Sequence, residues 1–276
     1  MAVQNSILTN ASAFTALRTL NTINRNLDTT QNRVSTGLKI AGALDDASNF
    51  SIAQGIRGEL KAITAVSSGL NAAKGIGKVA LAGVTGLSDL LGDVRSKLTE
   101  LSNEGITTAQ RDILGDDFNA LLSQAAAFID NAIFNGVNLL DTTTLSTDVA
   151  TLSNLNGGTL TLTAQDVRTT TLSLAGISTG SASAAQAAIS AQYANLESVV
   201  NTALGALGAE VRALDLQTSF LEQITDATEE GLGNIVDADL ARESARLTAL
   251  QVQQQLSVQT LGIANQRPQS LLGLFR

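Results

Sequence analysis

Hydrophobic residues near the end of the chain, from about Asp237 to Asn265, fall on two opposite sides of a predicted helix. At about 100° per residue, one narrow stripe is formed by Ala245, Ala249, Val252, Leu256 and Ile263. The far side carries Leu240, Leu247, Leu250, Val258 and Leu261. A helix that packs only on its own domain needs one apolar stripe, so the second stripe predicts contact with other molecules.

The start of the chain supplies a partner for one of these stripes. The segment from about Ser6 to Leu38 is predicted to be helical, with a stripe of Ala13, Leu17, Leu20, Leu27 and Val34. The pattern alone leaves open which C-terminal stripe meets this helix. Because Glu243 and Gln254 make the Leu247 stripe more polar, we expect the Ala245 stripe, with Ala249, Val252, Leu256 and Ile263, to be the intrachain seam. The predicted assembly interface is then Leu17, Leu20, Leu27, Val34, Leu240, Leu247, Leu250, Val258, Leu261, Leu271 and Leu272.

A regular heptad pattern lies between these terminal segments. Asp45 and Asp46 are expected to open a helix, since aspartate caps helix starts. Apolar or small residues then recur in steps of three and four, at Ile63, Val66, Leu70, Ala73, Gly77, Ala80, Val84, Leu87, Leu91, Val94, Leu98 and Leu101. This spacing predicts a left-handed coiled coil. After a turn at 102–105, similar spacing predicts helices over 114–132 and from about 183, with one extra residue near Leu204 and a joint at Gly231 and Gly233.

The middle of the chain has a different character. Turn residues at 156–158 and alternating segments at 160–163 and 170–174 predict a small β-hairpin region. The predicted fold is mainly α: a long antiparallel coiled-coil or helical-bundle rod from both chain ends, with the hairpin at its outer end. The expected division is a terminal helical pair (1–44 and 234–276), a helical rod (45–137 and 178–233) and a hairpin region (138–177).

Composition narrows the classes of partner. Only 3% of the 276 residues are aromatic, while 44% are hydrophobic, and small or aliphatic side chains suit helices packed side by side. The net charge is -8 and the sequence has no basic run, so nucleic acid is not an expected partner. No apolar segment reaches the roughly 18 residues that span a bilayer. The first residues do not have the pattern of a signal peptide.

Candidate catalytic chemistry is sparse. The sequence contains neither Cys nor His, which removes thiolate nucleophiles, imidazole bases and most transition-metal ligands. Gly75–Lys78 lacks the remaining residues of a phosphate-binding loop and falls inside the heptad pattern. The acidic pairs Asp45–Asp46 and Asp237/Asp239 are explained by helix capping. We therefore predict no catalytic, cofactor-binding or metal-binding residue, no cofactor and no enzymatic activity.

Several segments at the two ends share their order and spacing with one known family. Towards the N-terminus these are Ile7–Asn10, Ala16–Asn21, Arg33–Ile40, Asp45–Ala53 and Phe134–Val137. Towards the C-terminus they are Asp237–Ser244, Gln251–Gln255 and Ala264–Leu272. Over about 1–140 and 182–276, the chain therefore resembles bacterial flagellins. Its short middle resembles a small flagellin without large outer domains.

The resemblance implies a structural subunit that polymerises into the bacterial flagellar filament for swimming motility. In that family the two terminal segments form an antiparallel helical pair that lines the filament core. The implied partners are further copies of the chain, other flagellins, hook-associated and cap proteins and an export chaperone, without nucleic acid or membrane insertion. The implied location is the extracellular filament, reached through the flagellum's own channel.

Two alternatives remain at this point. A hook–filament junction protein of the same superfamily would share the terminal helices but would not grow long filaments. A soluble coiled-coil adaptor or enzyme would instead have a folded monomer with ordered ends and a ligand pocket.

Overall fold

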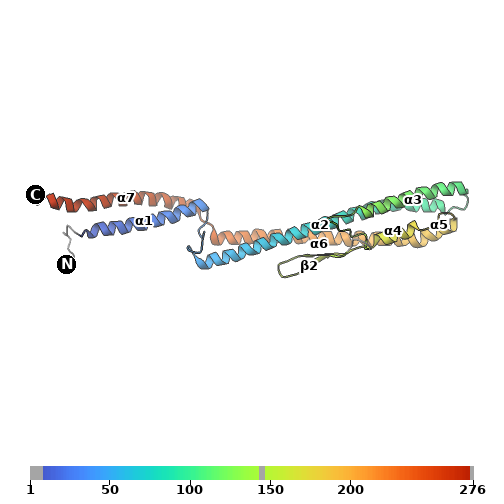
Figure 1. Cartoon of the computed structure of the whole chain (residues 1–276), viewed down its shortest axis with the longest axis horizontal. Coiled ribbons are helices and arrows are strands. Elements are labelled where there is room, and N and C mark those ends of the chain that lie inside the picture. Colours follow the sequence, from blue (N-terminus) through green and yellow to red (C-terminus); the bar gives the residue numbers. More distant parts are fainter. Residues whose placement is uncertain (1–8, 143–146, 274–276) are drawn as a thin grey trace. The chain divides into compact units, whose positions relative to one another are not determined.

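Helices dominate the computed structural model, which describes residues 9–142 and 147–273, with 267–273 as backbone only. The long helices are α1 (Ala11–Thr36), α2 (Ala47–Leu101), α3 (Thr108–Asp130), α6 (Ala194–Val236) and α7 (Leu240–Gly273) (Figure 1). The short elements are β1 (Val149–Leu152), β2 (Thr159–Leu162), α4 (Val167–Ala175), α5 (Ala182–Ala188) and the π-helix η1 (Ile189–Tyr193). The predicted fold class, mainly α with packed long helices and a small hairpin, is confirmed.

The described chain forms two compact units. Unit 1 combines its two ends, up to Glu59 and from Ala227, whereas unit 2 comprises Leu60–Asp226. The predicted division placed its boundaries elsewhere, at 44/45 and 233/234, and treated 138–177 as a separate region. Residues of that region, Leu139, Leu140, Leu162, Val167 and Leu174, belong to the core cluster of unit 2.

Aspartates define the entry to α2. The backbone N–H of Asn49 donates a 3.0 Å hydrogen bond to Oδ1 of Asp46. This bond holds the pKa of Asp46 below its ordinary value and confirms Asp46 as the cap of the helix. The neighbouring Asp45 has a different role, because its Oδ2 accepts from the N–H groups of Ala41 and Gly42 at 3.0 and 3.1 Å. Asp45 therefore closes the turn that precedes the helix.

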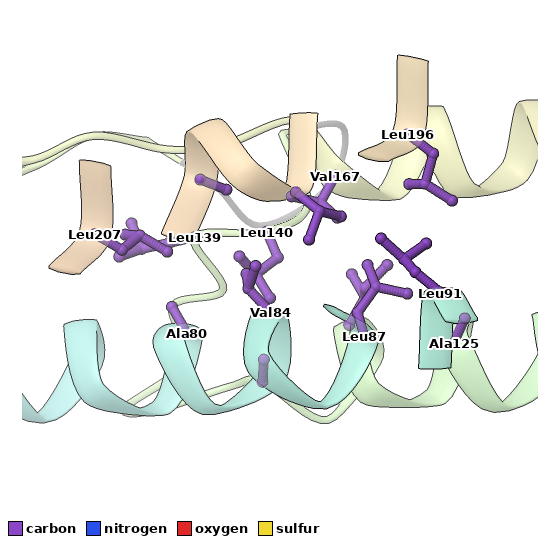
Figure 2. Packing of buried hydrophobic residues seen from close by; sticks show 14 of the residues in the cluster. Ala80, Val84, Leu87, Leu91, Ala125, Leu139, Leu140, Val167, Leu196 and Leu207 are labelled. Carbon is purple, nitrogen blue, oxygen red and sulfur yellow. The ribbon is translucent and has the colours of Figure 1, made fainter. Parts of the chain in front are cut away.

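The core of unit 2 follows the predicted heptad pattern of α2. All twelve predicted positions from Ile63 to Leu101 are buried. Figure 2 shows Val84, Leu87 and Leu91 directed from α2 towards the side chains of the facing segments, including Leu140, Val167 and Leu196. The heptad pattern thus predicted the buried face of this helix position by position.

Gly77, the weakest residue of that pattern, marks a close approach of α2 to α6. A Cβ atom at this position would lie 2.7 Å from Cγ2 of Val211, well inside van der Waals contact. Packing therefore requires glycine here, and the weak likeness of Gly75–Lys78 to a phosphate loop has a structural explanation inside a continuous helix.

The returning helix departs from strict periodicity at two places. Buried Ala188 is followed by buried Tyr193, and the five-residue step between them is accommodated by the π-helix η1. The extra residue predicted near Leu204 corresponds to equal four-residue steps between buried Ala203, Leu207 and Val211. The expected joint at Gly231 and Gly233 is wrong, because α6 continues through both and ends at Val236.

The hairpin region was only partly predicted, and its expected place at the outer end of the rod is wrong, because Thr151 and Leu162 lie against Gly69 and Gly77 in the middle of α2. Strands β1 and β2 pair antiparallel with Val149 opposite Leu162, and Gly157 in the connecting turn has a φ of +86°, as the turn signal predicted. The second expected strand, at 170–174, is wrong because this segment belongs to α4. Asp166 caps α4 by accepting from the N–H of Thr169 at 3.2 Å, and capping with core burial outweighs the strand preference of threonine.

Candidate assembly surface on the terminal helices

Among the described residues, three polar side-chain contacts join α1 to α7. Near the start of α1, Nδ2 of Asn10 donates to the carbonyl oxygen of Ala264 at 2.8 Å. Further along, Nε2 of Gln254 donates to Oδ1 of Asn24 at 2.9 Å. Towards the end of α1, Arg33 Nη1 lies 3.4 Å from Glu243 Oε1. The α7 partners occur in reverse chain order, so the two helices are antiparallel, as Figure 1 also shows.

Backbone hydrogen bonds connect the helix ends at one side of this pair. Gly37 ends α1 in the left-handed conformation, with a φ of +74°, which glycine adopts at low cost. Its carbonyl oxygen accepts from the N–H of Ala238 at 2.9 Å, and the N–H of Lys39 donates to Val236 at 2.7 Å. Asp239 then caps α7 by accepting from the N–H of Arg242 at 3.1 Å. These contacts fix where the pair begins.

The contact between α1 and α7 is a heptad seam that mixes apolar and polar residues. The α7 side consists of Glu243, Leu247, Leu250, Gln254, Ser257, Leu261 and Ala264, all buried or half-buried. The α1 side consists of Ala13, Ala16, Leu20, Ile23, Leu27, Thr30 and Val34, all buried or half-buried. Steps of three and four residues run through both sets, which is the spacing of a coiled-coil seam. The pair is therefore held by the stripe that contains Leu247.

The expected intrachain seam is wrong. Ala245 and Ala249 are exposed, and Val252, Leu256 and Ile263 are 51%, 55% and 64% exposed. The polar residues that argued against the Leu247 stripe are the ones that α1 accommodates, because Arg33 faces Glu243 and Asn24 bonds to Gln254. The polar residues of the Leu247 stripe therefore form paired polar layers inside the seam. They do not mark a helix face that contacts water.

The predicted assembly interface divides into two groups. Leu20, Leu27, Val34, Leu247, Leu250 and Leu261 lie in the intrachain seam. Leu17, Leu240 and Val258 remain 44%, 49% and 54% exposed. The side chains of Leu271 and Leu272 lie outside the described residues. The prediction missed Phe14, which is 56% exposed on α1, and Ile23 and Thr30, which continue the seam at heptad spacing.

The free face of α7 is the main unpartnered feature of unit 1. Ala245, Ala249, Val252, Leu256 and Ile263 lie within about 60° of one another on a helical wheel, on the side away from the α1 seam. We call these five residues the free stripe.

Among the described residues there is no group of three or more His, Cys, Asp or Glu side chains arranged to hold a metal ion. No described helix is long and apolar enough to cross a membrane.

These features define the class of the protein, a mainly helical chain whose ends pair and leave one apolar helix face free, as in a subunit of a larger assembly. Residues 7–145 match the bacterial flagellin N-terminal helical region and residues 188–275 match the C-terminal helical region. The chain belongs to the bacterial flagellin family. It is a structural subunit of the flagellar filament, in a short form without a large outer domain.

Full-length relatives agree with this assignment. Flagellin FljK and flagellin FljO of Caulobacter vibrioides are 39% and 38% identical to the chain, each over 99% of both sequences. A flagellin of Brucella melitensis is 37% identical over 98% of this chain and 99% of its own. The crystal structure of Bacillus cereus flagellin has the same fold, with a TM-score of 0.51 and 21% identity over 55% of this chain and 88% of that one.

Proposed function

We propose that this flagellin polymerises by burying the free stripe of α7 against neighbouring copies. The observation that carries the proposal is the half or greater exposure of Val252, Leu256 and Ile263 on a helix whose opposite side is already occupied by α1. Completing the burial of these three side chains contributes about 1 kcal/mol each. Repeated along a lattice, such contacts add to a stable assembly.

The seam residues act in this assembly by positioning. Leu20, Leu27 and Val34 of α1, with Leu247, Leu250 and Leu261 of α7, hold the two helices in register and so determine which side of α7 is presented. The exposed Leu17, Leu240 and Val258 lie beside the α1–α7 seam, away from the free stripe, and we propose that they form a separate apolar contact with neighbouring copies. A head-to-tail contact that does not close into a ring generates a helical filament, which is the form required of a flagellar subunit.

Copies of the chain assemble with themselves and with other flagellins in the extracellular flagellar filament, after export through the flagellum. Hook-associated and cap proteins are proposed to meet the filament at its two ends, and an export chaperone to bind the chain before secretion. The protein acts as a structural element without enzymatic activity. Family membership and the absence of Cys and His from the sequence support this role.

A single substitution on the free stripe tests the proposed interface. Leu256→Glu places a charge in the middle of the stripe, and we expect it to abolish filament growth as seen by sedimentation and negative-stain electron microscopy. Gln255→Glu adds the same charge at the adjacent exposed position, off the stripe, and should polymerise like the unmodified chain. Both variants should retain the helical circular dichroism of the parent. If Leu256→Glu polymerises as readily as Gln255→Glu, the free stripe is not the assembly interface.

A further inference from the structure

Charge is divided unevenly between the two units. Unit 2 contains 8 Lys or Arg and 16 Asp or Glu residues of the 17 and 25 in the chain. The sequence outside unit 2 therefore holds nine residues of each sign and is neutral, and the whole net charge of -8 lies in unit 2. Low net charge favours association, so the charge balance agrees with assembly through unit 1.

Within unit 1 the two signs are separated along the chain. Helices α1 and α7 together carry six Arg and only two acidic residues. The segments 37–46 and 227–239, which we call the acidic joint, carry one Lys and six acidic residues. The acidic residues of this joint are Asp45, Asp46, Glu229, Glu230, Asp237 and Asp239. One part of unit 1 is thus basic and the other is acidic.

Most of these charges form no ion pair within the described residues. The ion pair within unit 1 joins Arg33 to Glu243, and the other described ion pairs belong to unit 2. Exposed Arg18 and Arg25 line a polar groove on α1 together with Asp28, and neither arginine forms an ion pair with a carboxylate among the described residues. In the acidic joint, Glu229 and Glu230 are exposed on α6 and likewise have no basic partner.

Within one chain, the acidic joint lies too far along α1 from Arg18 and Arg25 to attract these two side chains strongly. With a rise of 1.5 Å per residue, Arg25 lies about 18 Å and Arg18 about 28 Å along α1 from Gly37, where the joint begins. Both separations exceed the Debye length of about 8 Å at physiological ionic strength. Strong attraction between the two regions therefore requires two different molecules.

We propose that the acidic joint of one copy lies against Arg18 and Arg25 on α1 of a neighbouring copy. The inference rests on the proposed self-assembly, and the occupant is a second copy because unit 1 carries both complementary surfaces. Such a contact is head-to-tail and does not close. Charge complementarity of this kind selects register and speeds encounter.

Charge reversal and its rescue test the contact. The variants are Glu229→Lys with Glu230→Lys, Arg18→Glu with Arg25→Glu, and the combination of all four. We expect each pair alone to raise the critical concentration for polymerisation about tenfold at low salt, and the combination to return it to within about threefold of the parent. At about 1 M NaCl, where the Debye length is about 3 Å, the effects of the single pairs should largely disappear.

The control is a matched change in unit 2. Asp89→Lys with Asp93→Lys alters the net charge by the same amount at exposed positions of α2 and should leave the critical concentration near that of the parent. The neutral pair Glu229→Gln with Glu230→Gln should give an intermediate increase, and circular dichroism verifies that each variant retains its helix content. If the reversal pairs behave like the control, or if the combination shows no rescue, the inference is overturned while the filament function stands. If the unmodified chain does not polymerise, the proposed function itself fails.

Discussion

Gln254 of α7 donates a 2.9 Å hydrogen bond from Nε2 to Oδ1 of Asn24 of α1, a residue 230 positions earlier in the chain. Both side chains are half-buried within a seam that is otherwise formed by mostly apolar or small residues. A polar layer in a helix seam fixes register at some cost in stability. This pair therefore helps to decide that the Leu247 stripe faces α1 and that the free stripe stays outside.

The Asn24–Gln254 pair can be tested by removing one partner or both. Asn24→Ala leaves the amide of Gln254 without its partner and should cost about 1 kcal/mol. Replacing both residues with Leu should restore or exceed the parent stability, because no polar group is left unpaired. Hydrogen exchange of the α7 amides reports the change in unit 1. Equal loss of protection in the single and double variants would show that the pair does not contribute through this bond.

Replacement of glycine by alanine should have opposite effects on stability at two positions of α2, Gly77 and Gly92. Gly77→Ala forces a Cβ against Val211 and should lower the free energy of unfolding of unit 2 by about 1–3 kcal/mol. At Gly92 nothing lies within 4 Å of an added Cβ, so Gly92→Ala should raise that free energy by about 0.5–1 kcal/mol. Urea unfolding followed by circular dichroism measures both. Stabilisation by Gly77→Ala would refute the close approach of α2 and α6.

Substitutions in the hairpin region should be tolerated only at exposed positions. Leu162 of β2 is 1% exposed, and Leu162→Ala should cost about 2–5 kcal/mol through the cavity that it leaves. Leu155 in the turn is 47% exposed, and Leu155→Ala should change stability by less than about 0.5 kcal/mol. Thermal unfolding of the two variants makes the comparison. Equal midpoints would mean that the hairpin does not contribute to the core of unit 2.

The helices were predictable where one pattern continued without interruption. The positions from Ile63 to Leu101 are buried as predicted because a long heptad run has a single way to face its partners. The prediction of a strand at 170–174 is wrong because it relied on the alternation of threonine or serine with leucine, although this segment belongs to α4. The cap at Asp166 could have corrected this reading, since aspartate three residues before Thr169 is typical of a helix start.

On the terminal helices, the sequence predicted two apolar stripes but did not determine which stripe faces α1. Two apolar stripes on α7 were correctly recognised, and the existence of a free face follows from them. Their assignment depended on which polar residues find partners across the seam. Arg33 opposite Glu243 and Asn24 opposite Gln254 are contacts between residues more than 200 positions apart, and only the register of the folded helices brings them together.

The most direct test of the central claim is thiol labelling at Leu256, which the cysteine-free sequence allows with a single reporter. The variant Leu256→Cys should react readily with a maleimide as a monomer and become protected on polymerisation. The control Leu250→Cys lies in the seam, where Leu250 is 7% exposed, and should be protected in the filament by α1 of the same chain. Unchanged labelling of Leu256→Cys in intact filaments would contradict the claim that assembly buries the free stripe of α7.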